Sequence, residues 1–166
     1  MASGDSLCFA NALNNQPPST SFATFDIRNN IPVLDFDDTA DEVARFGLFM
    51  PNHYSGGGVT LTIGWMATSA TTGTISLDGA FKSITNDVDD IDSKTFASDN
   101  NANPTTSSVS GKVIYTTIDF TDGSDMDSVQ AGEYFELRVR RDANGTTSTD
   151  NMVGDMELLF IEIKET

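Results

Sequence analysis

The segment VTLTIGW, residues 59–65, decides the fold class of this chain. Its apolar residues occupy alternate positions: Val59, Leu61, Ile63 and Trp65. Successive side chains of a β-strand point to opposite faces, so this alternation places all four apolar residues on one face. The segment therefore predicts a strand with one buried and one solvated face. Because Trp65 is in phase with the buried set, we expect it in the core rather than in a ligand platform.

The same alternation recurs in two segments further along the chain. FELRVR (residues 135–140) alternates apolar with charged side chains, and in LLFIEIK (158–164) Leu159, Ile161 and Ile163 alternate with more polar neighbours and Phe160. Other short segments rich in β-branched and aromatic residues lie between clusters of Gly, Asn, Asp and Ser, a pattern typical of strands and turns. The predicted strands are residues 23–27, 31–36, 41–50, 59–68, 73–84, 113–120, 134–141 and 157–164.

Eight short strands without a helical pattern predict an all-β fold. Such strands hide their apolar faces and edges only by closing a barrel or by stacking as two sheets. An antiparallel β-sandwich of the jelly-roll type suits about eight strands. Residues 22–166 are therefore expected to form one jelly-roll domain. The polar segment 87–110 is expected to be an exposed excursion with one short strand near 94–97.

Residues 1–21 are expected to form an N-terminal arm, because they lack sustained periodicity and include Pro17-Pro18, which disfavours both helix and sheet. Leu7, Phe9 and Leu13 give the arm an apolar character. These side chains could dock on a neighbouring subunit. The alternatives are a disordered leader or one that packs on its own domain.

The net charge of the chain limits the kinds of molecule that it is expected to bind. The chain has 166 residues, with 25 Asp plus Glu against 9 Lys plus Arg, a formal charge of −16. A field of this sign disfavours nucleic acid and anionic membranes, since both are recognised through clustered Lys and Arg. No signal peptide and no membrane-spanning segment is expected from the sequence. The acidity is also compatible with plain solubility or a saline medium.

Catalytic chemistry finds little support. Cys8 is the only cysteine and His53 the only histidine, and no nucleophile, phosphate-binding or dinucleotide-binding motif is present. We therefore expect no catalytic residues, no cofactor and no metal site. The acidic segments 87–92 and 119–127 could attract calcium, but the second departs from the calcium-loop template, so solvated turns are favoured for both.

Three arginines close together stand out in an acidic chain. Arg138, Arg140 and Arg141 hold a third of the positive charge, and the first two point outward from the predicted strand 134–141. Carboxylates are the expected partners. Arg138 and Arg140, together with Leu7, Phe9 and Leu13, are therefore the candidate interface residues, in an intersubunit or intersheet salt network.

Three segments resemble a known family. They are RFGLFMPNHY (45–54) with the strand before it, GGGVTLTIGWMATSA (56–70), and AGEYFELRVRRD (131–142) through to GDMELLFIEI (154–163). This pattern resembles the jelly-roll cement or decoration proteins of tailed bacteriophages, including cyanophages. The resemblance implies a homotrimer that binds the major capsid protein on the outer surface of the virion, needs no cofactor, and is made in the host cytoplasm.

The leading functional prediction is thus a non-enzymatic capsid decoration protein that stabilises a phage head by trimeric binding. The alternative is a receptor- or carbohydrate-binding jelly-roll module of a phage spike or tail, which would expose aromatic side chains among Tyr54, Tyr115 and Tyr134. A glycosidase or lyase is least favoured. Such enzymes use two carboxylates at a defined separation, but in a chain with so many acidic residues a pair at that separation is expected by chance and does not indicate catalysis.

Overall fold

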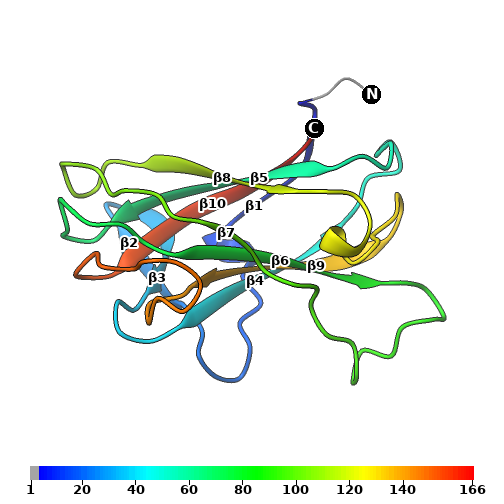
Figure 1. The fold of residues 1–166 in the computed structure, drawn as a ribbon, viewed down its shortest axis with the longest axis horizontal. Coiled ribbons are helices and arrows are strands. Elements are labelled where there is room, and N and C mark those ends of the chain that lie inside the picture. The colour runs from blue at the N-terminus through cyan, green and yellow to red at the C-terminus, as the bar shows by residue number, and fades with distance from the viewer. Residues whose placement is uncertain (1–3) are drawn as a thin grey trace.

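A computed structural model describes residues 4–166, and it consists of two antiparallel sheets packed face to face (Figure 1). Sheet A contains β1 (Ser6–Asn11), β2 (Thr24–Arg28), β3 (Ile31–Phe36), β5 (Val59–Ala67), β8 (Ile114–Phe120) and β10 (Met156–Glu165). Sheet B contains β4 (Glu42–Phe49), β6 (Leu77–Ile84), β7 (Asn100–Ala102) and β9 (Tyr134–Arg141). The helices of this region are two short 3-10 turns, η1 (Ala12–Asn14) and η2 (Ser124–Met126), and neither could cross a membrane.

The predicted all-β sandwich is confirmed, and each of the eight predicted strands overlaps an observed one. The prediction of a short strand near 94–97 is wrong, because the structure forms β7 at Asn100–Ala102 instead. Asparagine is a poor strand former. Here its side chains supply the reason for the strand: Asn100 Nδ2 donates to the Asp119 carbonyl and Asn101 Nδ2 to the Leu77 carbonyl.

The described part of the predicted arm belongs to the sandwich. Residues 6–11 form β1, which pairs with β10, and Leu7 is buried in the core. The chain then crosses to sheet B, where the Gln16 amide donates to the Arg45 carbonyl and the Ala23 amide to the Val43 carbonyl. The edge of β4 is thereby covered, which removes an open sheet edge. Residues 1–3 of the predicted arm lie outside the described residues.

The core confirms the alternation predicted for 59–65. Trp65 is fully buried, and its Nε1 donates a hydrogen bond of 2.8 Å to Thr116 Oγ1. In β10 the prediction holds only in part, because a bulge between Leu158 and Phe160 shifts the register against β5. As a result Leu158, not Leu159, joins the buried set. Phe160 remains on the outer face, where it pairs with Gly64.

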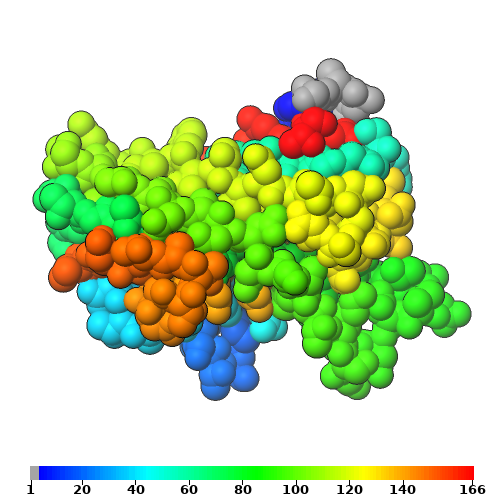
Figure 2. Space-filling model, viewed as in Figure 1, coloured from blue at the N-terminus to red at the C-terminus, as the bar shows by residue number. Residues whose placement is uncertain are grey.

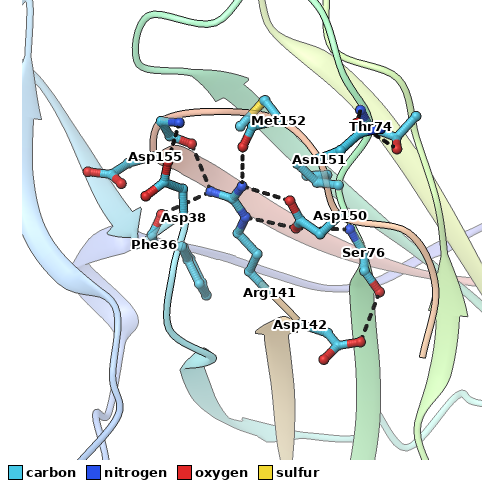
Figure 3. Close-up of polar contacts among 12 residues, drawn as sticks. Phe36, Asp38, Thr74, Ser76, Arg141, Asp142, Asp150, Asn151, Met152 and Asp155 are labelled. Carbon is cyan, nitrogen blue, oxygen red and sulfur yellow. Dashed lines mark hydrogen bonds and ion pairs between the residues drawn. The ribbon is translucent and has the colours of Figure 1, made fainter. Parts of the chain in front are cut away.

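Arg141, at the end of β9, fastens the loop that leads into β10 (Figure 3). Its guanidinium is fully buried and makes two hydrogen bonds to the Asp150 carboxylate, at 3.0 and 2.9 Å. The same group donates to the carbonyls of Met152 and Gly154 at 2.9 Å, and at longer range to that of Phe36 in sheet A. One side chain therefore ties sheet B, sheet A and the 142–155 loop together.

Candidate functional site

The outer face of sheet A is a broad surface over four neighbouring strands, β1, β10, β5 and β8. Strand register places Phe160, Gly64 and Tyr115 in one row across this face. The adjacent row runs from Phe9 through Glu162 and Thr62 to Thr117. Residues directly opposite in an antiparallel pair share one face of the sheet. The two rows therefore put aromatic and hydrogen-bonding side chains side by side.

Phe9, Phe160 and Tyr115 form what we call the aromatic face. The Phe9 and Phe160 rings are stacked with centroids 5.7 Å apart, and Tyr115 meets Phe160 edge to face at 5.2 Å. Phe9 is 61% exposed and Tyr115 is 69% exposed. Aromatic side chains lose favourable burial when they stay in water, so a solvent-facing cluster of three marks a contact surface.

Gly64 makes the arrangement of the rings possible. A methyl group on its Cα would overlap the ring atoms of Phe160, which occupies the space that a side chain at position 64 would fill. The absence of a side chain thus lets the Phe160 ring lie over the strand next to Tyr115. The signal for this site in the sequence is the glycine within an otherwise regular strand pattern, since such a glycine marks a close approach.

Polar groups border the rings. Thr60 Oγ1 donates to Asp119 Oδ1 at 2.7 Å, and Lys164 Nζ lies 3.3 Å from Glu162 Oε2. Thr117 is exposed on the same face. Hydroxyl, carboxylate and ammonium groups beside an aromatic cluster can bind a ligand that has both apolar faces and hydroxyl groups.

A hollow of about 280 Å³ continues the outer face beyond Tyr115 and Phe160, with Arg28, Met66, Val113 and Leu159 in its walls. The Arg28 guanidinium is held by the Glu157 carboxylate and by the Ala67 carbonyl at 3.0 Å. Arg28 is therefore a fixed charged group in the wall of a hollow that Asn29 also lines.

Asp35 pairs with Glu157 in the register of β3 and β10. Burial, followed by the negative charges of Asp155, Glu157, Asp26 and Glu42, raises the pKa of Asp35 to about 6. Its carboxylate is thus less stable in the folded chain than in water. This end of the outer face becomes more negative as pH rises through about 6.

The predicted interface residues lie in four separate places. Leu7 is buried in its own core, Phe9 belongs to the aromatic face, and Leu13 is 68% exposed at another edge. Arg138 and Arg140 lie on the outer face of sheet B, where they pair with Asp99 and Asp78 of the same chain. Their intersubunit role stays a prediction.

The three tyrosines proposed as exposed aromatics differ. Tyr54 is buried, and burial raises its pKa to about 12. Tyr115 is exposed, and Tyr134 is 36% exposed on sheet B. Tyr115 contacts the Phe160 ring of the aromatic face, whereas Tyr134 lies opposite the exposed Phe49 on sheet B.

The acidic segments use several carboxylates within their own turns. Asp89 pairs with Lys94 at 3.0 Å and accepts a hydrogen bond from the Thr85 amide. Asp125 accepts from the Thr121 amide and from Asn100 Nδ2. Within residues 4–166, no group of three or more His, Cys, Asp or Glu side chains is placed to hold a metal ion.

Comparison with known proteins gives structural matches only. No protein-family model matches the chain, and a search of curated proteins finds no match. Among solved structures it is similar to the CBM22-2 xylan-binding domain from Paenibacillus barcinonensis Xyn10C, with 11% identity, a TM-score of 0.51 and 92% of each chain covered. It is also similar to the carbohydrate-binding module CBM36 in complex with calcium and xylotriose, with 13% identity, a TM-score of 0.49, and 95% of this chain and 99% of that chain covered. The first likeness shows that the two chains share a β-sandwich fold.

Proposed function

We propose that this chain is a non-catalytic carbohydrate-binding module that contacts its ligand with the aromatic face. The observation that carries the proposal is the cluster of Phe9, Phe160 and Tyr115, bordered by hydrogen-bonding side chains on an open sheet. The shared fold with a xylan-binding domain supports the proposal, since this fold is used by proteins that bind sugars. Such a module could serve on a phage spike or tail.

The shape of the aromatic face favours an extended glycan over a single sugar. The face spans the three intervals between β1, β10, β5 and β8, which at the usual strand spacing is about 14 Å. Sugar rings would pack their apolar faces on Phe9, Phe160 and Tyr115. Their hydroxyl groups would bond to Thr62, Thr117 and Glu162 in the adjacent row. Ligand sites commonly combine apolar contacts in this way with a few polar groups that fix the orientation of the ligand.

The test is binding to a glycan array, followed by calorimetry on the best neutral glycan. We expect Tyr115→Ala to weaken binding by about ten-fold, because it removes an exposed ring that orients Phe160. Phe49→Ala, which removes an exposed aromatic ring from β4 of the opposite sheet, is the matched control and should bind like the original chain. Equal binding by the two variants, or the absence of any neutral ligand, would contradict the proposal.

Gly64→Ala supplies a second variant that keeps all three rings. The added methyl group overlaps the Phe160 ring and should turn it away from Tyr115. We expect weaker glycan binding with little change in far-UV circular dichroism. Unchanged binding would show that the arrangement of the rings does not matter.

A second candidate function is a homotrimeric decoration protein that binds the major capsid protein on the outer surface of a phage head. The observation in its favour is an apolar edge of Leu13, Phe22, Phe25 and Ile27, all exposed. Three of these side chains, excluding Ile27, line a hollow of about 320 Å³. β2 ends sheet A, so its outer edge is also open to a partner.

Light scattering tests this second function. We expect a mass of three times 17.8 kDa for the original chain, and a monomer for Phe25→Asp, because a charge placed in the apolar edge opposes its burial between subunits. Val153→Asp, at a side chain that is 80% exposed elsewhere, is the control and should remain trimeric. A monomeric original chain that also fails to bind phage heads lacking it would remove this candidate.

A further inference from the structure

Two arginines lie directly opposite each other on the outer face of sheet B. Arg45 of β4 pairs with Arg138 of β9, an arrangement in which like charges repel. Arg138 has a partner in Asp99 at 2.5 Å. The Arg45 guanidinium makes no ion pair with any residue from 4 to 166, although the chain is rich in acids. The Nε atoms of both arginines are buried and lack an acceptor there.

Three cationic side chains surround the ring of Phe96. Its ring centroid lies 5.3 Å from Arg45 Cζ, 4.8 Å from Arg138 Cζ and 5.0 Å from Lys82 Nζ. The carboxylates paired with this group are those of Asp99 and Glu136. Asp99 also pairs with Arg140, which in turn pairs with Asp78 and Asp41, so the connected group holds four cations and four carboxylates. Arg45 is the one of these cations that forms no ion pair within residues 4–166. A partly desolvated cation without an anionic partner is an unfavourable arrangement that a bound anion would relieve.

Neutral hydrogen-bonding groups lie beside Arg45, next to the Glu136 carboxylate, which is directly opposite Gly47 in the register of β4 and β9 and forms an ion pair with Lys82. Gly47 follows two residues later on the same face, and a methyl group there would overlap the Tyr134 hydroxyl and lie 2.7 Å from Gln16 Oε1. The hydroxyl and the amide therefore lie over Gly47. The segment that contains Gln16 and the 85–97 loop both project from the lower side of the molecule (Figure 2). The Arg45 group thus belongs to a face bordered by two projections.

We propose that this face holds a second binding site, specific for a carboxylate on a sugar acid. The Arg45 guanidinium would bind the carboxylate through its two-pronged donor set. The Tyr134 hydroxyl and the Gln16 amide would bond to ligand hydroxyl groups, which is why a sugar acid fits better than an acidic side chain. The site lies on the opposite sheet from the aromatic face and does not depend on it.

Calorimetric titration with sodium glucuronate is the direct test, with glucose as the uncharged comparison. We expect glucuronate to bind and glucose not to bind, and Arg45→Gln to weaken glucuronate binding by at least about ten-fold. Arg45→Lys should lose part of the affinity, because the ammonium cannot bind in the two-pronged way. Lys112→Gln is the control, since Lys112 also makes no ion pair within residues 4–166 and is exposed.

Three results would overturn the proposal: no binding of glucuronate, equal binding by Arg45→Gln, or tighter binding of a short Asp- and Glu-containing peptide. Circular dichroism of Arg45→Gln excludes misfolding as the cause of a loss. The two glycan proposals fail separately, because neutral glycans report on the aromatic face and glucuronate reports on the Arg45 site.

Discussion

Arg141→Met is expected to destabilise the fold by about 3–5 kcal/mol. Methionine retains much of the side-chain volume but removes every guanidinium hydrogen bond. The Asp150 carboxylate, whose side chain is 2% exposed, would then be a buried charge without its cation. The carbonyls of Met152 and Gly154 would lose their donors as well. Leaving such groups unsatisfied costs far more than a surface ion pair contributes.

Urea denaturation followed by far-UV circular dichroism measures this effect. Arg138→Met on the same strand is the matched control, because its side chain is 22% exposed and its ion pair with Asp99 is partly solvated. We expect the control to lose at most about 1 kcal/mol. A loss below that value for Arg141→Met would mean that the 142–155 loop is held by other contacts.

Trp65→Ala is the second large effect, with an expected loss of about 3–5 kcal/mol. Trp65 is the largest fully buried side chain of the described residues, and its removal would leave a cavity between the sheets. It would also leave the hydroxyl of Thr116, a residue that is 7% exposed, without its indole partner. The cavity and the lost hydrogen bond both lower the stability of the fold.

Far-UV circular dichroism is the appropriate probe for this variant, since Trp65 is the only tryptophan and its replacement removes the fluorescence signal. Trp65→Phe separates the two causes. It keeps most of the apolar volume and loses the hydrogen bond, so its expected cost is about 1–3 kcal/mol. If the two variants were equally stable, the cavity would contribute nothing.

Alternation of apolar and polar residues was enough to predict most of the sheet strands. It works for residues 59–65 and 135–140 because each of these segments buries one face and leaves the other partly solvated. It fails for β1, where a register irregularity between Ser6 and Cys8 interrupts the alternation. It also misplaces Leu159, because the bulge in β10 depends on pairing with β5 and not on local preference.

The candidate sites are less accessible to sequence reasoning. Phe160 could be predicted to point outward, but its contact with Tyr115 depends on the register of β5 against both β10 and β8. Likewise, the position of Phe96 over Arg45 depends on where a long loop returns to the sheet. Register is set by pairings between distant segments, so neither juxtaposition can be derived from one strand alone.

The place of β10 in sheet A has a consequence for biosynthesis. β10 pairs with β1, β3 and β5, yet it is the last of these strands in the chain. While the ribosome is still making residues 156–165, the earlier strands of this sheet have no central neighbour and expose their apolar faces. Sheet A can assemble only after translation has passed this point, so the nascent chain depends on delayed, long-range closure and is exposed to aggregation until then.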